Sequence, residues 1–283
     1  MASLKETKDR ISSVKSTLKI TSAMKLLAGA KLHKTQVTIS ALQSYKDELD
    51  YCLKQIGSGS VNISAAPNAK DRVCIVAFSS NSSLCGAFNA SIIRKTAKVL
   101  SECNSKPVCY FFGKKVSEAM EKCGYKSELN LNNLIDHPDY TSSAQFVDKL
   151  LKDFENGEFK EVRLIFSHHI STSSSEVTCR VLLPSQFNYV ADESNDMPEP
   201  DYILEPDAES IRRSLFQKLL HLDFHYTLLD SCLSEHSART IAMQTATENG
   251  ENMLSDLTLE YNKNRQAIIT SEILELEGGS VQE

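Results

Sequence analysis

The sequence predicts an α/β protein that combines a long antiparallel coiled coil, made by helices at the two ends of the chain, with a central Rossmann-like α/β domain. Three observations support this fold class. A seven-residue apolar repeat fills the start of the chain, strand-like and helical runs alternate in the middle, and a second seven-residue repeat fills the end. The predicted segments are residues 1–57 for the first helix, 70–190 for the α/β domain and 207–279 for the last helix.

The first segment lacks proline from residue 3 to residue 56, and a seven-residue frame fits it over about six heptads. One position of the frame is mainly Leu or Ile: Leu4, Ile11, Leu18, Lys25, Leu32 and Ile39. The other position is mainly Thr or Ala: Thr7, Val14, Thr21, Ala28, Thr35 and Leu42. These small side chains permit a partner helix to approach closely. The run GSGSVNISAAPNAK, from residue 57, is typical of a helix break.

The middle of the chain alternates between short apolar runs and amphipathic ones. RVCIVAFSS and KPVCYFFG are continuous apolar runs, which is typical of buried parallel strands. Helical spacing follows in ASIIRKTAKVLSEC, KKVSEAMEKCG and SAQFVDKLLKDFENG, and EVRLIFSHHI and EVTCRVLLP read as further strands. This alternation predicts an α/β layered domain.

An acidic, proline-containing linker at residues 191–206 precedes the last segment, which contains no proline. Steps of four and three define its frame: Leu215, Leu219, Leu222, Tyr226, Leu229, Leu233, His236, Thr240, Met243, Thr247, Gly250, Leu254, Leu257, Tyr261, Asn264 and Ile268. Neither terminal helix can bury its stripe alone, so the two should pair. If both helices leave the α/β domain in the same direction, they run antiparallel, with the basic residues 1–40 against the acidic residues 248–283. Solvated helix faces are the alternative interpretation of these charges.

Composition excludes several classes of protein. Apolar residues make up 41% of the chain, which has no Trp, and no run reaches the roughly 18 apolar residues of a spanning helix. A secretory signal is not evident, so we expect a soluble intracellular protein. Eight cysteines show no zinc spacing, and we expect free thiols. A basic first helix could suggest nucleic acid, but the interleaved aromatic residues expected for base stacking are missing.

Three candidate chemical sites fail on their motifs. The turn at residues 79–89 follows a strand, where a phosphate loop would lie, but it lacks the glycine patterns of nucleotide sites. His221 and His225 have a metal-binding spacing without the accompanying Glu, so we expect a solvated helix flank. His168 and His169 have no carboxylate or nucleophile nearby in sequence. We therefore predict no catalytic, cofactor or metal site.

Both ends of the chain resemble the gamma subunit of F-type ATP synthases. The stretch SLKETKDRISSVKSTLKITSAMKLLAGAKLHKTQ, residues 3–36, is similar to its opening, and residues 234–279 are similar to its close. SSLCGAFN, residues 82–89, resembles the family's loop after the first strand, although Ser83 stands where an Arg-Gly pair usually begins. The rest of the α/β region matches in pattern.

The resemblance implies a central rotor shaft that couples proton flow through a membrane ring to ATP synthesis or hydrolysis on other chains. The implied chain is non-catalytic and needs no cofactor. Its implied partners are a ring of three alpha and three beta subunits, an epsilon subunit and the c-subunit ring. Its implied location is peripheral, on the cytoplasmic side of a bacterial inner membrane, or alternatively on the matrix side of a mitochondrial inner membrane.

Matching to the family also implies contacts with the alpha/beta ring. They are Met24, Lys25 and Arg239 beside an acidic lever of a beta subunit, and Arg265, Gln266, Thr270 and Glu272 against a beta-subunit loop. Ordinary coiled-coil packing is the alternative interpretation of Met24, and a solvated face that of Arg265 and Gln266. Two other functions stay open: a rod-like scaffold, and a nucleotide-dependent enzyme with a helical arm.

Overall fold

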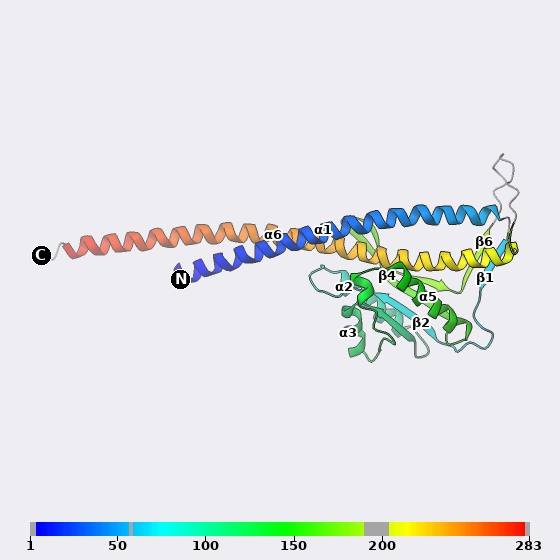
Figure 1. Cartoon of the computed structure of the whole chain (residues 1–283). Helices are drawn as coiled ribbons and strands as arrows, with labels where there is room; N and C mark the ends of the chain where they lie inside the picture. Colours follow the sequence, from blue (N-terminus) through cyan, green and yellow to red (C-terminus); the bar gives the residue numbers. More distant parts are fainter. Residues whose placement is uncertain (1–3, 57–58, 190–203, 281–283) are drawn as a thin grey trace. The chain divides into compact units, whose positions relative to one another are not determined.

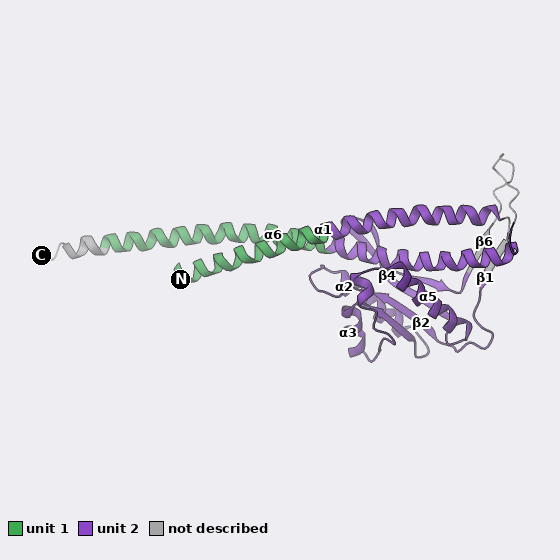
Figure 2. Ribbon diagram, viewed as in Figure 1, with its two compact units in different colours: residues 1–29, 239–283 green, residues 30–238 purple. Residues whose placement is uncertain are grey.

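The computed structural model describes residues 4–56, 59–189 and 204–280, which fold as two compact units (Figure 2). Unit 1 draws on residues 1–29 and 239–283, and unit 2 comprises residues 30–238. Two long helices, α1 (Leu4–Gln55) and α6 (Ala208–Ser280), contribute to both units (Figure 1). The predicted fold class, terminal helices with an α/β region between them, is confirmed.

In unit 1 the two helices pair antiparallel. The Thr247 Oγ1 hydroxyl donates to Thr21 Oγ1 at 3.0 Å. One turn away, a Cβ placed on Gly250 would lie 2.6 Å from Leu18 Cδ2, so Leu18 occupies the space that a side chain at position 250 would need. Residue numbers rise along one helix as they fall along the other. The partly buried positions of α6 follow the predicted frame: Thr247, Gly250, Leu254, Leu257, Tyr261 and Asn264.

The pairing in unit 1 ends before α6 does. The register that sets Thr21 opposite Thr247 brings Leu4, where α1 begins, opposite Asn264. From Arg265 to Leu274 every side chain is exposed. We call residues 265–274 the α6 overhang. The predicted frame extended to Ile268, and this last step is wrong, because Ile268 is 42% exposed.

Unit 2 contains a four-stranded sheet in the order β3-β2-β4-β5. Its central strand β2 (Val73–Phe78) pairs parallel with β3 (Val108–Phe112) and with β4 (Glu161–Ser171). The edge strand β5 (Ser174–Leu183) pairs antiparallel with β4. β2 is buried throughout its last five residues, as its apolar run predicts for a strand covered on both faces.

Helices cover both faces of this sheet (Figure 1). α2 (Phe88–Ser101) and α3 (Lys114–Lys122) pack on the face that carries Ile75, Ala77 and Phe111. α5 (Tyr140–Glu155) and the first part of α6 pack on the opposite face, where Phe224 meets Phe78, Phe112 and Phe146. Alternate strand residues point to opposite faces, which explains why neighbouring apolar residues enter different cores.

α1 also packs on α6 inside unit 2, where Leu49 and Leu53 contact Leu219 and Leu222. Three short elements were not predicted. β1 (Gly59–Ile63) forms within the run expected only to break the first helix, and it pairs antiparallel with β6 (Ser185–Tyr189). α4 (Asn133–Asp136) is a single turn before α5. Each is too short to carry a recognisable apolar period.

All eight cysteines are free thiols. Cys52 and Cys123 are exposed, and Cys74, Cys85, Cys109 and Cys232 are buried. Burial raises the pKa of the Cys109 thiol to about 12. A thiol with so high a pKa is protonated at neutral pH and therefore a poor nucleophile.

The expectation of a solvated flank at His221 and His225 is wrong. His221 Nε2 lies 2.8 Å from Asp148 Oδ1, and His225 Nδ1 lies 3.0 Å from Ser143 Oγ. His225 is 5% exposed, because α5 covers this side of α6. The four-residue spacing of His221 and His225 therefore places both side chains against α5.

We expect the stability of the chain to depend on pH through His225. Burial lowers the pKa of His225 below its ordinary value of 6.5, although the negative charge of Asp139 acts in the opposite direction. Between the folded and unfolded pKa values the unfolded chain binds more protons, so the stabilising contribution is complete above about pH 6.5 and is lost as the pH falls through the folded pKa. The free energy of unfolding, measured with urea, should therefore fall more steeply below about pH 6.5 in wild type than in His225→Asn.

Other titrating groups are common to the two proteins and cancel in the comparison. His33→Asn, at an exposed position of α1, is the matched control and should retain the wild-type slope. Parallel pH profiles for wild type and His225→Asn would contradict the prediction.

Candidate functional site

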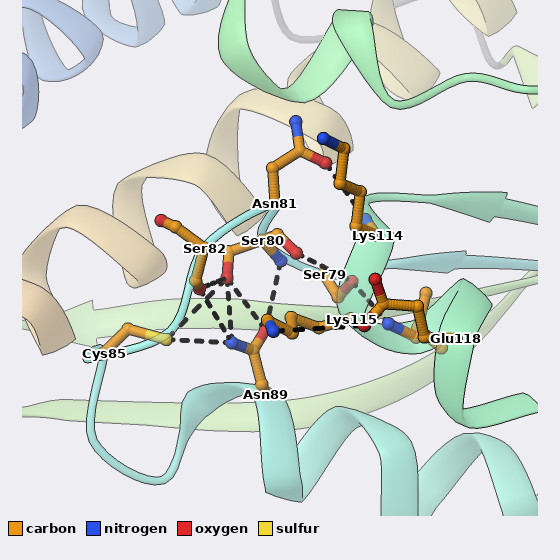
Figure 3. Close-up of polar contacts among 10 residues, drawn as sticks. Ser79, Ser80, Asn81, Ser82, Cys85, Asn89, Lys114, Lys115 and Glu118 are labelled. Carbon is orange, nitrogen blue, oxygen red and sulfur yellow. Dashed lines mark hydrogen bonds and ion pairs between the residues drawn. The ribbon is translucent and has the colours of Figure 1, made fainter.

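The turn after β2 lies where the sequence would place a phosphate-binding loop. It instead caps the N-terminus of α3 (Figure 3). The first three amides of α3 donate to this turn: Lys114 N to Asn81 Oδ1 at 3.0 Å, Lys115 N to Ser80 O at 3.2 Å, and Val116 N to Ser79 Oγ at 3.0 Å. A helix N-terminus binds phosphate through its unpaired amides, and the first three amides of α3 are already bonded. At the N-terminus of α2, the helix that the turn opens, Phe88 N donates to the Cys85 carbonyl at 3.3 Å and Ala87 makes no side-chain capping bond.

The turn is also closed upon itself. Asn89 Oδ1 accepts from the Ser80 amide at 3.1 Å, and Asn89 Nδ2 donates to Cys85 Sγ at 3.1 Å. Gly113, which joins β3 to α3, has a φ of +99° and lies so close to Ser79 that a Cβ would be 2.2 Å from its carbonyl oxygen. Residues 79–81, which directly precede the loop that resembles the family's motif, therefore fix how β2, β3 and α3 meet.

His168, at the end of β4, has a carboxylate beside it in space, although none lies nearby in sequence. Asp230 Oδ2 of α6 lies 2.7 Å from His168 Nδ1. Sequence spacing could not reveal this pair, because 62 residues separate its members.

The proposed contact residues fall into two groups along unit 1. Met24 and Lys25 are half-buried on α1, and the register places Met24 opposite residue 244, about one and a half turns from Arg239. Arg239 is 9% exposed. Beside them, a groove of about 460 Å³ is lined by Leu18, Lys19, Ser22, Ala23, Leu26, Thr247 and Glu251.

The second group lies on the α6 overhang. Arg265, Gln266, Thr270 and Glu272 are all exposed there, and Thr270 Oγ1 donates to the Gln266 carbonyl at 2.8 Å. Arg265 follows residue 244 by about 30 Å of helix. The members of each group thus lie within about two turns of one another along the helix pair, and the two groups are separated.

Exposed apolar side chains accompany both groups, and the sequence analysis missed them. Leu26 and Leu27 are 71% and 66% exposed beside Met24. The overhang carries Ile268, Ile269, Ile273 and Leu274, each more than two-fifths exposed. A cluster of exposed apolar residues is typical of a protein-binding surface. The sequence signal that could have revealed them is that apolar residues outside the seven-residue frame should be exposed. Ile268 was instead assigned to the frame.

The chain matches known proteins over its whole length. A family model described as ATP synthase matches residues 3–281. The ATP synthase gamma chain of Phocaeicola vulgatus is 41% identical over 288 residues, covering 99% of this chain and 100% of that protein. The ATP synthase gamma chain of Bacteroides thetaiotaomicron is 40% identical, with each chain covered completely.

Solved structures agree on the fold. A chain in the cryo-EM structure of the Euglena gracilis mitochondrial ATP synthase OSCP/F1/c-ring has a TM-score of 0.64 at 17% identity, covering 98% of this chain and 93% of that one. A chain in the rotor structure from the same organism has a TM-score of 0.60 at 15% identity, covering 94% and 98%.

Within the described residues, no helix is long and apolar enough to cross a membrane. The bacterial relatives are named ATP synthase gamma chains, which supports the coarser expectation of a membrane-associated complex. Relatives so similar over the full length confirm the function predicted from the sequence, that of a non-catalytic rotary subunit. The chain belongs to the ATP synthase gamma chain family.

Proposed function

We propose that the paired helices of unit 1 turn inside a ring of alpha and beta subunits and bias its catalytic sites in sequence. The α6 overhang is the observation that carries this proposal. Ten consecutive exposed residues with several large apolar side chains are costly to leave in water, so a partner surface should cover them. The small side chains of α1 in unit 1 keep the helix pair narrow, which suits rotation inside a confined cavity.

Met24, Lys25 and Arg239 are proposed to contact one part of the ring, and Arg265, Gln266, Thr270 and Glu272 another. Arg265 presents a planar fork of donors that suits carboxylates and carbonyls, and Gln266 adds a donor and an acceptor. Contacts that form at some shaft angles and break at others shift the conformational equilibrium of a distant site, because they differ in free energy between its states.

Unit 2 is proposed to lie toward the membrane, with an epsilon subunit and the c-subunit ring as neighbours. On this proposal the complex is peripheral, on the cytoplasmic side of a bacterial inner membrane. On the same proposal, the predicted segments 1–57 and 207–279 form the shaft, and the predicted segment 70–190 forms its base.

The test uses the reconstituted complex. The double variant Arg265→Ala, Gln266→Ala should leave the fold of the isolated chain nearly unchanged, because exposed side chains contribute little to stability. It should lower ATP hydrolysis or the proton pumping that hydrolysis drives. Nucleotide binding should be retained, because the nucleotide sites belong to other chains.

The matched control is Asn262→Ala, Lys263→Ala. These residues are exposed on the same helix, one turn before, where α6 is still paired with α1. If the double variant Arg265→Ala, Gln266→Ala hydrolysed ATP and pumped protons at wild-type rates, these two residues would be a solvated face and not a contact site. Failure of the purified wild-type chain to assemble with alpha and beta subunits would favour a scaffold.

A further inference from the structure

Helix α6 in unit 2 is buried on three sides, and one of those sides is polar. Phe216, Leu220, Phe224, Leu228 and Cys232 face the core under α5. Leu215, Leu219 and Leu222 face α1. The third side carries a stripe with steps of four, three, four and three: Asp223, Thr227, Asp230, Ser234 and Ser237. We call these five residues the polar stripe.

Each member of the polar stripe bonds to the β4–β5 hairpin. Arg180 of β5 donates to Thr227 Oγ1 at 2.7 Å and pairs with Asp223 at 2.9 Å. Ser234 Oγ donates to the Ser167 carbonyl at 2.8 Å, and Ser237 Oγ donates to the Thr172 carbonyl.

Asp230 lies at the centre of the stripe and is 3% exposed. Its Oδ2 is 2.7 Å from His168 Nδ1, and its Oδ1 accepts from the His169 amide at 3.1 Å. A buried carboxylate is tolerated when both oxygens are bonded in this way.

Apolar contacts and hydrogen bonds resist different motions. Apolar packing is non-directional, so a helix held by apolar side chains alone retains much of its burial when it slips or turns about its axis. Hydrogen bonds depend steeply on distance and angle and break on a small rotation. A buried polar network therefore selects one arrangement among several that would bury equal area.

We propose that the polar stripe is a rotational lock, which fixes the angle of α6 against the β4–β5 hairpin so that torque passes between sheet and helix without slip. The lock rests on the proposed shaft function, and Asp230 is its central positioning residue. The stripe contacts the β4–β5 hairpin of the same chain and needs no external ligand.

The test compares Asp230→Leu, which removes both bonds at similar volume, with Asp230→Asn, which keeps an acceptor for the His169 amide. In the isolated full-length chain, hydrogen exchange of the His169 amide should accelerate in Asp230→Leu and stay slow in Asp230→Asn. In the reconstituted complex, protons pumped per ATP hydrolysed should fall by about twofold or more in Asp230→Leu and recover in Asp230→Asn.

The matched control is Leu220→Ala on the same helix, which destabilises the apolar core and leaves the stripe intact. It should lose stability while it keeps the wild-type ratio of pumping to hydrolysis. An equal loss of coupling in Leu220→Ala, or wild-type coupling in Asp230→Leu, would overturn the lock.

Should Asp230→Leu fail to fold, the double variant Ser234→Ala, Ser237→Ala removes two bonds of the stripe with little change of volume, and it should lower the same ratio. Unchanged coupling in a folded double variant would then count against the lock. A wild-type complex that hydrolyses ATP and pumps no protons would instead contradict the shaft function.

Discussion

Gly113→Ala is expected to destabilise the α/β region by about 3 kcal/mol or more, because it combines two costs. Gly113 has a φ of +99°, a conformation that an L side chain rarely adopts. An alanine Cβ would also lie 2.2 Å from the backbone oxygen of Ser79, which cannot move without separating β2 from β3. Urea unfolding of the full chain, followed by circular dichroism, measures the loss.

Gly124→Ala separates the two costs. Gly124 follows the same helix α3 with a φ of +88°, and a Cβ there would meet open space. This control should cost about 1 kcal/mol, from backbone strain alone. Equal losses in the two variants would show that Ser79 yields easily and that the junction after β3 is soft.

Leu18→Pro is the second change with a large expected effect, about 3 kcal/mol or more within unit 1. Proline removes the amide that bonds one turn back and clashes with the preceding turn. Leu18 also packs over Gly250, so distortion of α1 should separate the two helices. We expect a loss of helical signal in circular dichroism and faster hydrogen exchange in both helices of unit 1, while unit 2 keeps its protection.

Leu18→Ala is the control for the side chain. It keeps a good helix former and shortens the side chain that packs over Gly250, so most of the helical signal should remain. Helix content at the wild-type level in Leu18→Pro would contradict the two-helix unit.

The terminal helices could be predicted from sequence because a seven-residue repeat is a local signal that accumulates over many turns. Thr21 and Gly250 illustrate the principle, since small residues in the frame marked where the helices approach. The repeat does not state where a partner ends, so Ile268 was placed inside the pairing. The end of the pairing depends on the register between the helices, which is a property of two segments together.

The histidines show the opposite case. His168, His221 and His225 each bond to a residue at least 62 positions away, and no local pattern encodes such a partner. His221 and His225 were expected to be solvated, but helix α5 packs over them. The contact residues from Met24 to Glu272 were suggested by resemblance, and their roles stay a prediction.

The Thr21–Thr247 bond joins residues 226 positions apart, and this separation has a consequence for how the chain is made. At the speed of a ribosome, α1 leaves the tunnel on the order of tens of seconds before its partner exists. Until then its apolar stripe has nothing to cover it, and a long helix gains most of its stability from such packing. Helix α1 is therefore synthesised long before α6 and completes its packing only when α6 has formed.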